Sequence, residues 1–124
     1  MKKITLFLLI LAILLSGCGG KKYKASAKAI SCAERAVAVG EQYMNKDISS
    51  NDAADILHEI VEDMDYLDGM SSEDETYISD SSIKVSILNL SISIPYDNFK
   101  NDSESYDKVL ENIEAIKNDV KEYK

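Results

Sequence analysis

Apolar and polar positions alternate with a helical period along most of the chain beyond residue 24. In residues 25–46 the alanines and larger apolar side chains fall on one half of a helical cylinder, and the charged and amide side chains fall on the other. Residues 51–68 repeat this pattern, and Ser49 with Asp52 three positions later resembles the capping box that begins a helix. The short turn between the two segments predicts an antiparallel helical hairpin.

A heptad seam marks the end of the chain, where Ser103 is expected to cap a last helix and Leu110 lies beside the seam. The seam consists of apolar residues at spacings of three and four: Tyr106, Val109, Ile113, Ile116, Val120 and Tyr123. The segment is shorter than a free-standing coiled coil requires, so we expect it to pack into its own domain.

Residues 77–94 are ambiguous between strand and helix. Alternating Ile, Val and Leu residues favour a strand. As a helix, the segment would carry two apolar stripes on opposite sides: Tyr77, Ile78, Val85, Leu88 and Ile92 on one, and Ile83, Ile87, Leu90 and Ile94 on the other. We favour the helix, because no other segment offers a partner strand and because a one-residue slip after Ile87 would turn a strand's buried face outward. Two stripes suit the central member of a bundle, with Ser72 as a candidate cap before it and Pro95 at its end.

These elements predict an all-α fold, a small antiparallel bundle of about four helices that follows a signal helix. The chain of 124 residues suits one domain and is too short for the two lobes of a transporter's solute-binding protein. Its net charge of −8 argues against nucleic-acid partners, because phosphates demand clustered Lys and Arg, and it suits a basic partner.

The first twenty residues follow a different pattern. Lys2 and Lys3 precede an apolar run that is too short to span a membrane, and the run ends in Leu15-Ser16-Gly17-Cys18. This ending resembles the lipobox of bacterial lipoproteins, which implies that a diacylglyceryl group is attached to Cys18 and that the signal is cut just before it. The implied organisation is a signal peptide over residues 1–17, a lipidated flexible tether over residues 18–24 and a single helical domain over residues 25–124.

Such an anchor would hold the domain at the extracytoplasmic face of the cell membrane, with membrane lipid as a partner through Cys18. Two acyl chains are sufficient for stable anchoring, and Lys21, Lys22 and Lys24 would favour an anionic leaflet. The run of residues 43–49 is also similar to helix-hairpin segments of small uncharacterised helical lipoproteins of low-GC Gram-positive bacteria. That second resemblance implies no activity.

Residues 47–80 contain twelve acids and no Lys or Arg. Part of this stretch invites comparison with a calcium loop, but Asp68 stands where the EF-hand requires glycine, so we expect no specific EF-hand. A solvated acidic face is the simpler interpretation. A looser divalent-cation site would draw on Asp63, Asp65, Asp68, Glu73 and Glu75.

Cys32 and His58 are isolated candidates for chemistry. With Cys18 lipidated, Cys32 has no partner in the chain, so we expect it to be buried as a small apolar residue, while an intermolecular disulfide stays open. His58 falls on the polar face of the second helix, with Glu62 one turn later. This pair offers too few ligands for structural zinc and lacks a nucleophile, so we expect no enzyme and no cofactor.

The anchor, the compact domain and the lack of a catalytic set favour a non-catalytic interaction or scaffold module at the cell envelope. Its partner would be an envelope or extracellular protein. The alternative is an acidic module that binds or senses divalent cations. Cys18 is the functional residue that the sequence predicts most directly.

Overall fold

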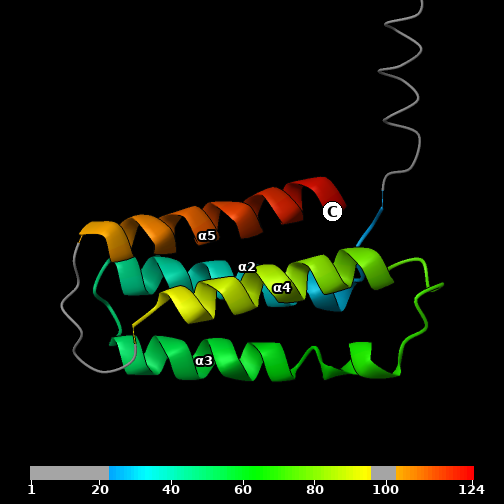
Figure 1. Cartoon of the computed structure of the whole chain (residues 1–124), viewed down its shortest axis with the longest axis horizontal. Helices are drawn as coiled ribbons and strands as arrows, with labels where there is room; N and C mark the ends of the chain where they lie inside the picture. The colour runs from blue at the N-terminus through cyan, green and yellow to red at the C-terminus, as the bar shows by residue number, and fades with distance from the viewer. Residues whose placement is uncertain (1–22, 96–102) are drawn as a thin grey trace, which may run out of the picture.

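The computed structural model describes residues 23–95 and 103–124, whose helices form a bundle (Figure 1). In chain order the elements are α2 (Ala27–Met44), α3 (Ser50–Glu62), the 3-10 helix η1 (Asp65–Gly69), α4 (Tyr77–Ser93) and α5 (Ser103–Tyr123). No strand occurs in these two ranges, and the predicted all-α bundle is confirmed.

Successive helices run antiparallel, and α2 and α4 lie between α5 on one side of the bundle and α3 on the other (Figure 1). α2 and α4 each contact both α3 and α5, and they also contact each other across the bundle. η1 packs against α4. Since its neighbours all lie on one side, α4 turns its remaining side away from the helices that the structure describes.

Small residues on the inner face of α2 allow its neighbours to approach closely, as the alanine pattern predicts. At Gly40 an added Cβ would lie 2.8 Å from Cγ1 of Ile113 and 3.3 Å from Cδ2 of Leu90. A side chain at this position would therefore force the packed residues of α5 and α4 to shift. The buried residues of α2 are Ala29, Cys32, Ala33, Ala36, Val39, Gly40 and Tyr43.

Serine hydroxyls begin two of the helices. Ser26 Oγ accepts a hydrogen bond from Ala29 N–H at 3.2 Å, and Ser49 Oγ accepts one from Asp52 N–H at 3.1 Å. Each hydroxyl satisfies one of the backbone donors that a helix leaves unpaired at its start. The predicted cap at Ser49 is thereby confirmed.

The second helix is shorter than the sequence predicts. α3 ends at Glu62 instead of Asp68, and η1 follows. Hydrogen bonds from Met64 N–H to Val61 O and from Leu67 N–H to Met64 O tighten the backbone towards three residues per turn. This period keeps Met64 and Leu67 on one side, and both are buried. The periodic pattern of apolar residues continues past Glu62, but the helix type changes.

The heptad seam of α5 faces the core as predicted. Val109, Ile113 and Ile116 are buried, and Tyr106 and Val120 pack against the core while partly exposed. α5 begins at Ser103, and the capping contact predicted for that side chain lies outside the described side chains.

Residues 77–93 form a helix, as favoured over the strand, and Ile94 follows it with an extended backbone, but the expectation that both apolar stripes face neighbours is wrong. One stripe is buried and consists of Ile83, Ile87, Leu90 and Ile94. The other stripe is mostly exposed, because α3, α5 and α2 all lie on the opposite side of α4. The cap predicted at Ser72 is also wrong, because α4 follows Thr76, which makes no side-chain capping bond.

Candidate functional site

The predicted lipidation residue, Cys18, lies outside the described residues. Within residues 23–95 and 103–124, no helix combines the length and the hydropathy of a membrane span. The described chain starts at the end of the bundle where α5 finishes (Figure 1). Ala25 N–H donates to Tyr123 O at 3.0 Å there, and Lys124 pairs with Glu34 of α2 at 3.1 Å. These contacts tie the start of the domain to its last helix.

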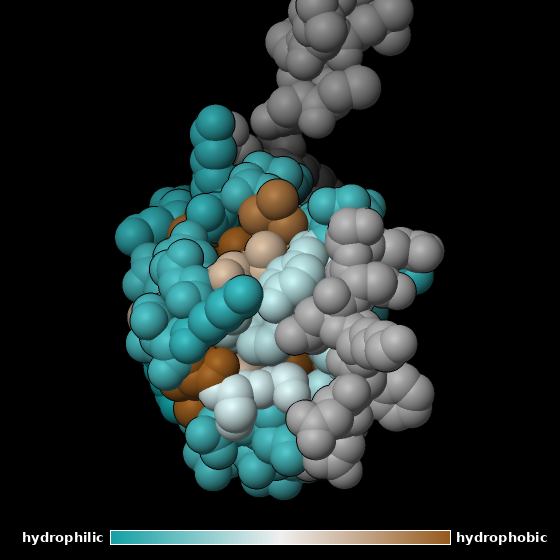
Figure 2. Space-filling model, turned by 90° about the vertical axis from the view of Figure 1, so that its left-hand side faces the viewer, coloured by the Kyte–Doolittle hydropathy of each residue, from teal (hydrophilic) through white to brown (hydrophobic). Residues whose placement is uncertain are grey.

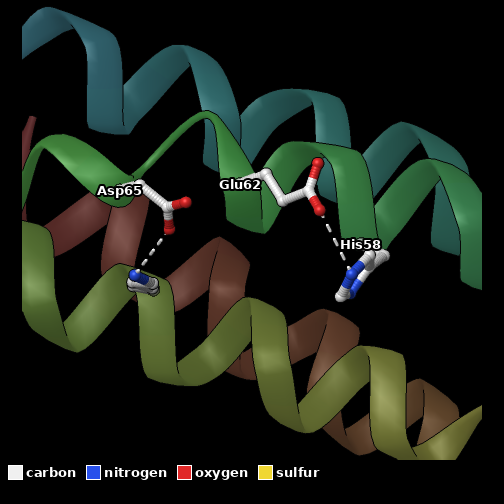
Figure 3. A network of polar contacts seen from close by, with 4 residues as sticks. His58, Glu62 and Asp65 are labelled. Carbon is white, nitrogen blue, oxygen red and sulfur yellow. Dashed lines mark hydrogen bonds and ion pairs between the residues drawn. The ribbon is translucent and has the colours of Figure 1, made fainter.

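Two of the five acidic residues that were candidates for cation binding pair with basic residues on different helices. Asp63 Oδ2 accepts a hydrogen bond from Arg35 of α2 at 2.9 Å. Asp65 points towards α4, where Lys84 Nζ lies 3.4 Å from its Oδ1 (Figure 3). The remaining candidates are exposed: Asp68, Glu73 and Glu75. In the part of the chain that the structure describes, no three His, Cys, Asp or Glu side chains are grouped so that they could hold a metal ion.

His58 lies on the exposed side of α3, as expected, with Nε2 3.3 Å from Oε1 of Glu62 one turn later (Figure 3). Both side chains are well exposed to solvent. An exposed pair of this spacing is a weak surface interaction. The geometry therefore adds nothing that would activate the imidazole as a base.

Cys32 is a free cysteine in the core, which confirms the expectation that it is buried. Burial is the main reason that the pKa of its thiol is raised above the ordinary value. The thiol is therefore protonated at neutral pH, and α2 would have to unpack before the sulfur could reach another chain.

A buried carboxylate joins three elements at the end of the bundle where the described chain starts. Asp80, in the first turn of α4, has no exposed surface. Its Oδ1 accepts a hydrogen bond from Ser26 N–H at 2.8 Å, and its Oδ2 accepts bonds from Ser26 Oγ at 2.7 Å and from Tyr66 Oη at 2.9 Å. These contacts connect α4 with the start of α2 and with η1. We call Ser26, Tyr66 and Asp80 the polar latch.

Helix geometry and burial explain why the polar latch is stable. The carboxylate of Asp80 lies at the start of α2 and in the first turn of its own helix, and both helix N-termini favour negative charge. Burial is the largest cause that raises the pKa of Tyr66 to about 12, and the hydrogen bond to Asp80 acts in the same direction. Lys28 Nζ lies over the aromatic ring of Tyr66, 4.9 Å from its centre. Because Ser26 and Tyr66 both donate hydrogen bonds to the Asp80 carboxylate, the polar latch is suited to holding α2, η1 and α4 together.

Sequence reasoning missed the polar latch, because Asp80 was counted with the acids of the solvated face. A usable signal exists, since Asp80 precedes Ile83 by three residues and Ile87 by seven. That register places it on the buried stripe of α4. Its partners come from positions 54 and 14 residues earlier in the chain, and no local pattern identifies them.

Four of the six large hydrophobic residues that are exposed in the described part of the chain lie on one stripe of α4. Exposed fractions are 51% for Ile78, 55% for Val85, 36% for Leu88 and 79% for Ile92. The stripe borders a surface pocket of about 400 Å³ between η1 and α4. We call the stripe and this pocket together the α4 face; the pocket is lined by Leu67, Asp68, Met70, Tyr77, Ser81, Lys84, Val85 and Leu88.

The end of the bundle with the α2–α3 turn has a different character. Tyr43 and Tyr106 stack there with ring centroids 6.1 Å apart, beside a pocket that Lys46 and Ile48 also line. Figure 2 shows this end as a mainly hydrophilic surface on which hydrophobic residues form small, separate patches.

The described residues thus combine a polar latch, which joins α4 to the start of α2 and to η1, with an α4 face whose apolar stripe is mostly exposed. The latch fits a structural role, and the α4 face fits contact with another molecule. No protein-family model matches this chain, and comparisons with curated proteins and with solved structures found no match.

Proposed function

We propose that the protein is a non-catalytic interaction module held at the outer face of the cell membrane by a diacylglyceryl group on Cys18. The exposed apolar α4 face carries the interaction part of this proposal. Contiguous exposed apolar residues are uncommon on proteins that act alone, and covering them is favourable by about 25 cal/mol per Å². The lipobox-like sequence Leu15-Ser16-Gly17-Cys18 supports the anchor.

The place where the described chain starts supports the same function. The described chain starts at one end of the bundle, whereas α4 runs along its length (Figure 1). An anchor joined to that end leaves the α4 face directed sideways, where a partner can reach it. Lys24 at the end of the proposed tether and Lys28 in the first turn of α2 would favour the orientation with this end towards an anionic leaflet.

The fragment that begins at Lys21 is expected to retain a protein from envelope or extracellular fractions of the source cells. The measurement is a pull-down with and without chemical crosslinking, followed by mass spectrometry. A fragment with its helices unfolded by heat serves as the control for non-specific capture. Failure to retain any protein specifically, even after crosslinking, contradicts the interaction module.

The Cys18→Ser variant is expected to lose lipid labelling and to leave the membrane fraction, because a serine hydroxyl cannot form the thioether. Metabolic labelling with an alkyne fatty acid and fractionation of the full chain provide the measurement. Cys32→Ser is the matched control and should keep both the label and the location. Equal labelling of the Cys18→Ser variant and the wild type would overturn the anchor.

A further inference from the structure

We infer that the α4 face binds an amphipathic helix that carries basic side chains beside its apolar stripe. This inference rests on the proposed interaction function and specifies its partner. It depends on three features of the face: the spacing of its apolar residues, the pocket beside η1, and the charges that surround it.

The apolar residues of the α4 face lie in a straight row. Ile78, Val85 and Ile92 are spaced by seven residues, and Ser81 and Leu88 fall between them at spacings of three and four. This heptad order is the one by which one helix packs along another. The row runs along a helix of 17 residues, long enough for several turns of a partner. Ser81 and Ser82 are small and allow the partner backbone to come close.

The pocket next to η1 widens the row into a groove. Leu67 and Met70 lie on its far side from α4, and Tyr77 lies near the start of the helix. Met70 and Tyr77 are half-buried and keep part of their apolar surface accessible. A volume of about 400 Å³ is sufficient for a large apolar side chain of the partner. The groove therefore offers an anchor point beside the row.

The row itself is uncharged, but its borders are acidic. The exposed or half-buried positions along this row and beside it are Ile78, Ser81, Ser82, Val85, Leu88, Asn89 and Ile92. On the η1 side, Asp68 lines the pocket, and Asp65 is partly neutralised by Lys84. On the α5 side, Asp119 accepts a hydrogen bond from Ser86 of α4. Burial and, to a smaller extent, the charge of Glu122 raise the pKa of Asp119.

The charge pattern separates the proposed partner from two others. Lys108 lies near Ile92, so the acidic borders belong mainly to the half of α4 that begins at Tyr77. Two copies of this chain packed with their α4 helices parallel would bring acidic borders together, which is unfavourable. An anionic membrane would be repelled by the same borders. A helix with Lys or Arg beside its apolar stripe satisfies both the apolar row and the acidic borders.

Two fluorescent peptides as long as α4, 17 residues, provide the test. Both have Leu in heptad positions; one has Lys at the flanking positions, and the other has Glu. Fluorescence anisotropy with the fragment of residues 23–124, which contains every described helix, should show the Lys peptide binding at least about tenfold more tightly than the Glu peptide at low salt. Added salt should reduce this difference.

Matched variants locate the binding. Val85→Ser with Ile92→Ser should weaken binding of the Lys peptide by about tenfold or more, because both side chains are exposed and face the partner. Leu110→Ser, at a residue 49% exposed on α5, should leave binding unchanged. Asp68→Asn should reduce the preference for Lys over Glu, whereas Asp107→Asn should not. Circular dichroism establishes that each variant is folded.

Several outcomes overturn the inference. These are no binding of the Lys peptide, equal binding of the two peptides, or binding that the α4 substitutions leave unchanged. Sedimentation that shows a dimer dissociated by Val85→Ser with Ile92→Ser assigns the face to a second copy, and α4-dependent binding to phosphatidylglycerol vesicles assigns it to lipid. A partner captured equally well by the α4 variant overturns this inference but leaves the interaction function in place.

Discussion

Asp80→Ala is expected to lower the free energy of unfolding by about 3–5 kcal/mol, because the substitution leaves buried donors without an acceptor. The donors are the N–H and hydroxyl of Ser26 and the hydroxyl of Tyr66, which all reach the carboxylate within 2.9 Å. The loss should disconnect the start of α2 from α4 and η1. Urea unfolding of the fragment of residues 23–124, followed by circular dichroism, measures the change.

Two further variants make the Asp80 result specific. Asp68→Ala removes an exposed acid from η1 and should change stability by no more than about 0.5 kcal/mol. Asp80→Asn keeps the size of the side chain and one good acceptor. It should therefore lower the free energy of unfolding by about 1–3 kcal/mol, between the effects of Asp68→Ala and Asp80→Ala. If Asp80→Ala were no more damaging than Asp68→Ala, the polar latch would not hold the bundle together.

Ile87→Ala is expected to destabilise the fold by about 2–5 kcal/mol, because it removes buried atoms and leaves a cavity. Ile92→Ala makes the same chemical change one and a half turns further along α4, on the opposite side. Since Ile92 is 79% exposed, its replacement should alter stability by only about 0.5 kcal/mol. Parallel urea titrations of the two variants give the comparison.

The pair of isoleucine variants tests both the helical assignment and its orientation. In a strand, Ile87 and Ile92 would also lie on opposite faces, because they are an odd number of positions apart. A third variant, Ile94→Ala, is therefore needed to distinguish the helix from a strand. Ile94 belongs to the buried stripe in the helix but would share a face with Ile92 in a strand. Equal effects at Ile92 and Ile94 would contradict the orientation of α4 described above.

Most helices of this fold could be predicted from local pattern. The inner face of α2, the cap of α3 at Ser49 and the heptad seam of α5 all depend on neighbours a few residues apart, which periodicity reports directly. The end of α3 could not be predicted in this way. Met64 and Leu67 fit an α-helical and a three-residue period alike, and the tighter turn was identified only from its hydrogen bonds.

The candidate sites were harder to predict than the helices. Asp80 belongs by composition to an acidic stretch, yet its carboxylate is buried against Ser26 and Tyr66. Asp63 and Asp65 lie two residues apart, yet they pair with bases on different helices. In each case the partner is distant in sequence, and no spacing rule connects the two.

Periodicity within the chain was enough to indicate the class of the fold, the approximate number of helices and the lining of the core, because each helix must bury an apolar face. The two equivalent stripes of α4 could not be told apart in that way, since both have heptad spacing and similar side chains. Tertiary packing made the distinction. α3, α5 and α2 cover the stripe that contains Ile83, Ile87 and Leu90 and leave the stripe that contains Ile92 open. A helix at the surface of a four-helix bundle has neighbours on one side only, so the side turned away from them stays exposed.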